Sequence, residues 1–166
     1  DFWHIYCENC GTIEHVKTLS AKADESEAKL RTLNHWKDPE DNILLTEKRL
    51  TRFAVDGDIR YIDLKITLRA SHGEVVFEEF KDGFAGIRTH RNLRLSVKKD
   101  KSVQALGSAE NSEGITGKEV WGKKADWVHY WGKVEGSDAG MAFFNHPDNL
   151  RSPVWWHARD YGLVAA

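Results

Sequence analysis

Three histidines in the last third of the chain, His129, His146 and His157, have side chains suited to catalysis. Imidazole is the side chain whose ordinary pKa lies nearest neutrality, so it serves as a general acid or base and as a metal ligand. We expect His146 and His157 to transfer protons as catalytic residues, with Glu113 as a carboxylate partner. In an alternative interpretation, the three histidines together bind a divalent metal cofactor, which would be copper, zinc or iron.

Charged and aromatic residues near these histidines suit the recognition of a sugar. The pair Arg159-Asp160 follows His157 closely and can hold a carboxylate or sugar hydroxyls. The chain has 7 tryptophans, and an indole can stack on a sugar ring or anchor a core, or one protein can use both roles. We therefore expect these substrate-binding residues: Arg88, Lys118, Trp127, Trp155, Arg159 and Asp160.

A second constellation lies near the start of the chain, where Cys7 and Cys10 form a Cys-x-x-Cys pair flanked by His4 and His15. Zinc sites use such a pair, although the usual signature has a second pair further along the chain. Three interpretations stay open at this point: a zinc site, a disulfide, and two free structural cysteines.

The composition limits the class of protein. The chain has 166 residues, which suits one domain, and hydrophobic residues make up 40% of it, which excludes a disordered tail. The formal net charge is −2 and the sequence pI is about 6.5, so we expect no nucleic-acid partner. Mean hydropathy is −0.57 and no apolar run approaches the length of a membrane helix, so we expect no membrane insertion.

The elements that must position these groups follow a period of two residues. In Ile59–Ala70 apolar and polar residues alternate, as in a strand with one apolar and one largely polar face. Leu44–Val55 predicts another strand, and Asp56-Gly57-Asp58 between them predicts a hairpin turn. Ser20–Leu33 suits a helix or a hairpin, and we favour strands. Further strands are predicted at Gly73–Phe80, Leu93–Lys98, Val103–Leu106, Trp127–Val134 and Ala139–Phe144.

These strands predict an all-β fold, an antiparallel β-sandwich with long loops, over a single domain of residues 1–166. A fragment of a mutarotase-like supersandwich is one form of it. The segment Asn111–Lys124 is long for a connection and is either a functional loop or an ordinary crossover. The apolar residues at both ends are typical of strand interiors, so we expect a truncated form whose open sheet edge could let copies associate.

Several short elements, most of all those in the last third, resemble a bacterial domain family labelled "methane oxygenase PmoA" over nearly the whole chain. They are Glu8-Asn9-Cys10-Gly11, Lys81-Asp82-Gly83, Asn111-Ser112-Glu113-Gly114, Gly117-Lys118-Glu119, His146-Pro147 and Trp156-His157-Ala158-Arg159-Asp160-Tyr161-Gly162. The resemblance implies the C-terminal portion of a longer β-sandwich domain, secreted or periplasmic and encoded near sugar-processing genes. The label itself implies copper and oxygen chemistry, but not the membrane subunit of methane monooxygenase, because this polar chain has no spanning segment.

The sequence therefore predicts a carbohydrate-active protein that acts on or binds a sugar ring, with mutarotase-, lyase- or hydrolase-like chemistry by histidines. Two alternatives stay open. One is a soluble metalloenzyme that uses His129, His146 and His157, and the other is a non-catalytic binding module. The expected partner is a small-molecule or carbohydrate ligand.

Overall fold

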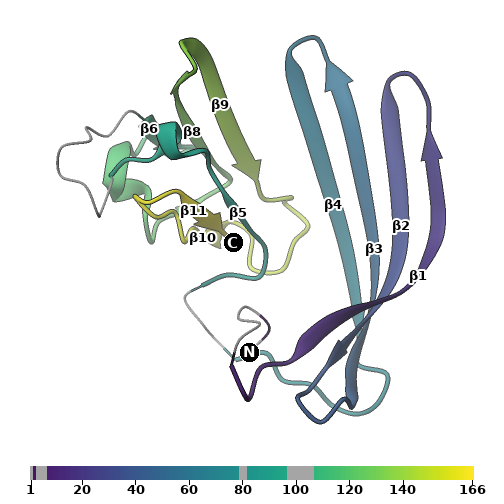
Figure 1. The fold of residues 1–166 in the computed structure, drawn as a ribbon. Coiled ribbons are helices and arrows are strands. Elements are labelled where there is room, and N and C mark those ends of the chain that lie inside the picture. Colours follow the sequence, from purple (N-terminus) through teal and green to yellow (C-terminus); the bar gives the residue numbers. More distant parts are fainter. Residues whose placement is uncertain (1, 3–6, 79–81, 97–106) are drawn as a thin grey trace. The chain divides into compact units, whose positions relative to one another are not determined.

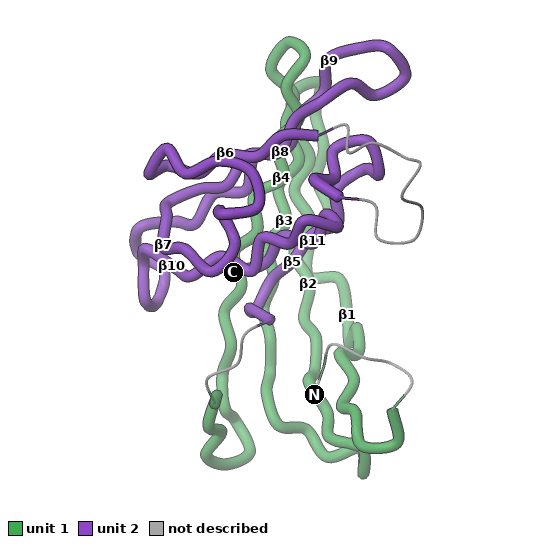
Figure 2. Tube along the Cα trace, turned by 90° about the vertical axis from the view of Figure 1, so that its left-hand side faces the viewer, with its two compact units in different colours: residues 1–78 green, residues 79–166 purple. Residues whose placement is uncertain are grey.

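The computed structural model describes residues 2, 7–78, 82–96 and 107–166 (Figure 1). The chain divides into two compact units, unit 1 over residues 1–78 and unit 2 over residues 79–166 (Figure 2). The single domain expected over residues 1–166 stays a prediction.

Unit 1 contains a four-stranded antiparallel sheet in which each strand pairs with the next along the chain. Its strands are β1 (Thr12–Ala23), β2 (Glu27–Lys37), β3 (Ile43–Asp56) and β4 (Ile59–Arg69). The two predicted strands around Asp56-Gly57-Asp58 are confirmed, and Gly57 adopts a φ of 56° in the turn. The ambiguous segment Ser20–Leu33 is a hairpin and not a helix, in line with its alternation.

Strand β1 lies at one edge of this sheet and is irregular. Its register against β2 shifts between His15 and Lys17, and again between Thr18 and Ser20. Each shift leaves one residue of β1 unpaired, Val16 in the first case and Leu19 in the second. These are β-bulges, which twist a strand locally and interrupt its ladder.

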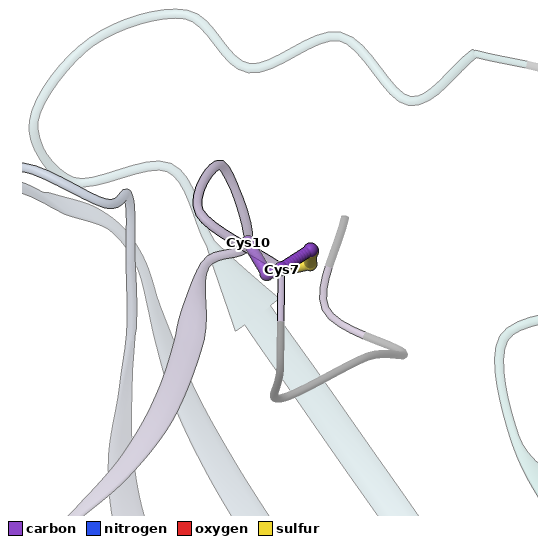
Figure 3. Close-up of a disulfide and its surroundings, with 2 residues drawn as sticks. All are labelled: Cys7 and Cys10. Atoms are coloured by element: carbon purple, nitrogen blue, oxygen red, sulfur yellow. A yellow bond between two sulfur atoms is a disulfide. The ribbon is translucent and has the colours of Figure 1, made fainter.

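Cys7 and Cys10 form a disulfide in the segment that precedes β1 (Figure 3). Of the three interpretations left open by the sequence, the structure has the disulfide, and no cysteine is free. A disulfide removes both thiolates from metal ligation, so the zinc interpretation is wrong. His4, its proposed flanking ligand, lies outside the described residues.

Unit 2 is built from short antiparallel ladders. Strand β8 is central in a three-stranded sheet with β6 and β9, whereas β5 pairs with β11 and β7 with β10. The strands are β5 (Gly86–Arg88), β6 (Gly107–Asn111), β7 (Lys124–Ala125), β8 (Trp127–Val134), β9 (Ser137–Phe144), β10 (Val154–Trp155) and β11 (Leu163–Ala165), with two short 3₁₀ helices, η1 (Arg91–Leu93) and η2 (Gly117–Val120). The predicted strands Trp127–Val134 and Ala139–Phe144 are confirmed.

Two predicted strands are wrong over their described part. Residues 73–78 contain a short apolar run but pair with no described strand, and Val76 and Phe77 are exposed there. In place of the strand predicted at Leu93–Lys98, Leu93 is the last residue of η1. His90 caps the N-terminus of η1, and its Nδ1 accepts a hydrogen bond from the Asn92 amide. The prediction at Val103–Leu106 lies outside the described residues.

The core of unit 2 forms where the inner face of β8 meets the last residues of the chain. Val128 and Tyr130 on β8 are fully buried and pack in one cluster with Trp156, Ala158 and Val164. The structure confirms the predicted class, all-β with antiparallel sheets, and agrees with a β-sandwich. Among the described residues, no helix has the length and apolar character needed to cross a membrane.

Unit 1 carries a buried carboxylate, Glu47, whose exposed fraction is 0%. It accepts hydrogen bonds from Asn34 Nδ2 at 2.8 Å and Trp36 Nε1 at 2.7 Å, and from Arg49 Nε at 2.6 Å and Nη2 at 3.1 Å. Burial raises the pKa of Glu47, but the hydrogen bonds from Arg49, Trp36 and Asn34 outweigh it, and the pKa lies below the ordinary 4.5. The charged form is therefore stabilised in the folded state.

Replacing this carboxylate is expected to destabilise the protein. Glu47→Gln removes a charged acceptor from buried donors, so the free energy of unfolding at neutral pH should fall by about 2 kcal/mol. A depressed folded-state pKa contributes stability above the unfolded value of 4.5, and that stability is lost as the pH falls through the lower folded pKa. Urea unfolding between pH 7 and pH 3 should show this loss in the wild type and a shallower one in the variant.

Glu40→Gln, in the exposed turn between β2 and β3, is the matched control and should leave stability unchanged. Equal stability of the Glu47→Gln variant and the wild type at pH 7 would contradict the role of the network.

Candidate functional site

The last residues of the chain fold back on themselves in a tight hairpin, here called the C-terminal hairpin (residues 156–166). The amide of His157 donates to the Ala165 carbonyl at 2.9 Å, and the amide of Arg159 donates to the Leu163 carbonyl at 2.7 Å. The amide of Gly162 donates to the Arg159 carbonyl at 2.9 Å, which closes the tip. The hairpin therefore presents residues 159–162 at its turn.

Two buried aromatic side chains hold this hairpin. The Trp156 indole Nε1 donates to the Ala125 carbonyl at 2.8 Å, and the Tyr130 hydroxyl donates to the Arg159 carbonyl at 3.2 Å. Burial raises the pKa of Tyr130, and the negative charge of Asp160 adds to the rise, so the phenol stays a neutral donor. Core packing and hydrogen bonding thus fix the backbone on which the charged side chains stand.

Alternation along the hairpin then decides which side chains share a face. Trp156 and Ala158 point into the core, so His157 and Arg159 project from the opposite face. Arg88 is paired with Leu163 on β11, whose neighbour Val164 is a core residue, so Arg88 projects on that same opposite face. Three residues predicted for the site, His157, Arg159 and Arg88, are brought to one face by this pairing.

On this face the cations lie against aromatic rings. The Arg159 guanidinium carbon is 5.4 Å from the ring centroid of Trp121 and 5.4 Å from that of Tyr161. The Arg88 guanidinium carbon is 6.0 Å from the Tyr161 centroid. All three distances are within the range of cation–π attraction. Neither guanidinium donates a hydrogen bond to a described residue, so their donors stay available to a ligand.

Asp160 and Lys118 complete the group. The Asp160 carboxylate accepts a hydrogen bond from Ser96 Oγ at 2.6 Å, and its Oδ2 lies 3.9 Å from Lys118 Nζ. The Asp160 carbonyl accepts from the amides of Leu95 at 2.8 Å and Ser96 at 3.0 Å, which fixes the carboxylate's position. We call the whole group the Arg–Tyr cluster, which comprises Arg88, Lys118, Trp121, Arg159, Asp160 and Tyr161.

Two buried donors beside the cluster have no hydrogen-bond partner among the described residues, Thr89 Oγ1 and Arg94 Nε. Both border Gly162, where a Cβ atom would overlap the Thr89 hydroxyl and lie 3.5 Å from Arg94 Nε. Buried polar atoms are nearly always satisfied, because an unmet donor costs the free energy of its lost hydration. Thr89 and Arg94 are therefore two buried donors whose hydrogen-bonding capacity the described residues leave unused.

His157 lies on the same face with a carboxylate beside it. Its Nε2 is 3.6 Å from Asp82 Oδ1, and its side chain is only 5% exposed. A carboxylate next to an imidazole orients the ring. Among the described residues, His157 is the only predicted catalytic histidine whose imidazole is buried beside a carboxylate.

The other two predicted catalytic residues lie in exposed turns, with no described contact to His157. The His146 side chain is 68% exposed, and its Nδ1 accepts from the Asp148 amide at 3.1 Å. Glu113 accepts a hydrogen bond from its neighbour Ser112 at 3.1 Å. Local turn contacts account for both side chains.

The remaining predicted residues lie on other surfaces of unit 2. The rings of Trp127 and Phe144 are 6.4 Å apart on β8 and β9, and His129 stacks on Trp131 at 4.8 Å. The indole of Trp155 is 64% exposed and faces Lys124 Nζ at 5.5 Å.

The described residues contain no group of three or more His, Cys, Asp or Glu side chains that could hold a metal ion. The predicted triad of His129, His146 and His157 is therefore not formed in this structure. His129 lies on β8, His146 lies in a turn and His157 lies in the C-terminal hairpin, and each of them contacts different neighbouring residues.

Sequence reasoning missed several members of the site. Trp121 lies in the long segment Asn111–Lys124, and Tyr161 follows Asp160 directly, so both were adjacent to signals that were used. Asp82 belongs to the Lys81-Asp82-Gly83 element that carries the family resemblance, but no role in the site was predicted for it. Thr89 and Arg94 carry no sequence signal, because only folding leaves their donors without partners.

The fold and the cluster define an all-β antiparallel protein with a cationic and aromatic surface site. The chain belongs to the Family of unknown function (DUF6807), whose sequence model matches residues 1–166. No curated protein and no solved structure matches the chain.

Gly162 sets the geometry of the hairpin tip, with a φ of 89° and the Thr89 hydroxyl where a Cβ atom would lie. Gly162→Ala should therefore lower the free energy of unfolding by about 1–3 kcal/mol, through strain and displacement of Thr89. The matched control is Gly136→Ala, where φ is 84° and no atom lies within 4 Å of the new Cβ. Urea unfolding of both variants separates the two effects, and an equal loss at both positions would show that the overlap contributes nothing.

Proposed function

We propose that the protein is carbohydrate-active and that the Arg–Tyr cluster binds a sugar ring bearing a carboxylate. The observation that carries this proposal is the environment of Arg159. Its guanidinium stacks on two aromatic rings and is half-buried, yet it donates to no described residue. A guanidinium presents donors in a planar fork that matches a carboxylate.

The other members of the cluster supply what a sugar ring also needs. Trp121 is 49% exposed, so part of its face is open to the C–H face of a sugar. Lys118 and Asp160 offer a donor and an acceptor for hydroxyl groups, and Arg88 offers a second guanidinium beside Tyr161. A neutral sugar would leave the guanidinium charges without a counter-charge, which favours an acidic sugar.

His157 supports an acid–base role within this proposal. It is the one histidine of the predicted set on the face of the cluster, and Asp82 stands close enough to orient its imidazole. Proton transfer to or from the bound sugar therefore falls to His157, with Asp82 as a positioning residue. His146 and Glu113 are not needed for it.

The metalloenzyme alternative has no ligand set among the described residues in its favour. The label "methane oxygenase PmoA" and its metal chemistry would need a ligand set, and the described part of the chain offers none of three or more residues. A non-catalytic binding module would use the same Arg–Tyr cluster without the His157 chemistry.

Binding of monosaccharides tests this function. Isothermal titration calorimetry should show glucuronate or galacturonate binding at least about tenfold more tightly than glucose or galactose, because a charge-assisted hydrogen bond is gained. Arg159→Gln should abolish that preference, and Arg159→Lys should restore only part of it, because an ammonium lacks the fork.

Arg60→Gln is the matched control, because this exposed arginine lies in the β3–β4 hairpin of unit 1 and should not affect binding. The proposal fails if neutral and acidic sugars bind alike, or if the Arg159→Gln variant keeps the preference.

A further inference from the structure

The four-stranded sheet of unit 1 has two faces of opposite character. On one face the register places Trp36 beside Leu45, Leu30 beside Thr51, and Phe53 beside Ile62. On the other face Lys17 shares a row with Lys48, and Arg31 shares the next row with Lys65. We call this second surface the basic face, defined by Lys17, Arg31, Lys48 and Lys65.

These four cations are exposed and unopposed. None of them forms an ion pair or a side-chain hydrogen bond with a described residue. The carboxylates on the same face are engaged elsewhere: Glu14 pairs with Lys37, Glu27 with Lys29 and Arg52, and Asp63 with Arg52. The charge is thus concentrated on one face although the whole chain carries a net charge of −2.

The pleated sheet spaces these charges regularly. Lys17 and Lys48 are separated by one strand, as are Arg31 and Lys65, so each pair stands about 10 Å apart across the sheet. The two rows are about 7 Å apart along the strands. The positions between the cations hold Leu33 and Leu50, and Ser20 and Thr67 end the rows with hydroxyls.

We infer that the basic face binds an anionic polysaccharide of the polyuronate class. Such a polymer carries one carboxylate on each sugar ring and hydroxyls between, which complements separated cations with hydroxyl side chains among them. Its binding does not rest on the proposed function, because the basic face belongs to unit 1 and shares no residue with the Arg–Tyr cluster.

The chemistry of this face favours a polysaccharide over other polyanions. Single-stranded nucleic acids bind where bases stack on aromatic side chains, and the two basic rows contain none. Duplex DNA is read by a helix or ribbon that enters a groove, which a flat sheet face does not supply. Protein partners anchor through aromatic hot spots, which the rows also lack.

Affinity electrophoresis of the full chain in gels that contain polygalacturonate tests the inference. The wild type should be retarded by polygalacturonate and not by the neutral polymer dextran, and added salt should weaken the retardation. The double variant Lys48→Gln with Lys65→Gln should raise the dissociation constant about tenfold, at roughly threefold for each exposed charge.

Two further variants keep the result specific. The pair Lys123→Gln with Lys133→Gln changes the net charge equally on exposed residues of unit 2 and should leave binding unchanged. The pair Lys48→Arg with Lys65→Arg retains both charges and should bind as the wild type, which separates lost charge from a folding defect.

Competing polymers complete the test. The inference is overturned if single-stranded DNA or polyglutamate binds as tightly as polygalacturonate, if dextran retards the protein equally, or if the Lys48/Lys65 glutamine variant keeps full affinity. Arg159→Gln should bind the polymer as the wild type does. Loss of polymer binding in the Arg159→Gln variant would show that the polymer binds at the Arg–Tyr cluster, which contradicts the inference. Loss of monosaccharide binding alone in that variant bears only on the proposed function.

Discussion

The burial of one indole, that of Trp156, is the constraint on which the candidate site depends. The ring is 1% exposed, packs 5.3 Å from Phe143, and satisfies its only donor on the Ala125 carbonyl. Because this side chain is fixed in the core, strand alternation places His157 and Arg159 on the opposite face. Pairing of β5 with β11 then adds Arg88 to that face. A hydrophobic contact thus determines where the charges stand.

Buried polar atoms are paired in one part of the structure and unpaired in another. Glu47 is fully buried, and its hydrogen bonds from Asn34 and Trp36 join β2 to β3, while Arg49 of the same strand pairs with its charge, so the network helps hold the sheet together. Thr89 and Arg94 have buried donors that meet no acceptor among the described residues. The Glu47 carboxylate is thus fully engaged, whereas two donors beside Gly162, where the hairpin turns, are unpaired. The paired network stabilises unit 1, and the unpaired donors lie beside the cluster for which we propose a binding role.

Local patterns in the sequence predicted the strands whose partners are close along the chain. Leu44–Val55 and the alternating segment Ile59–Ala70 are joined by a short turn, so their pairing needs no distant information. The apolar run at residues 73–78 did not become a strand, because a strand also needs a neighbour to pair with and none is present among the described strands. The type of residue identified Arg88, Lys118, Arg159 and Asp160 for the site, and the structure brings them together. Asp82 beside His157, and Trp121 beneath Arg159, arise from contacts between distant parts of the chain that no local pattern contains.

The bulges in β1 have a consequence for self-association. An exposed edge strand offers its outward amides and carbonyls as a template on which another chain can add a strand. In β1 the extra residues Val16 and Leu19 interrupt the regular spacing of these outward amides and carbonyls twice within a few residues. A regular incoming strand could stay in step with β1 only over short stretches, between one bulge and the next. The irregularity of this edge therefore disfavours the addition of strands from other chains to the sheet.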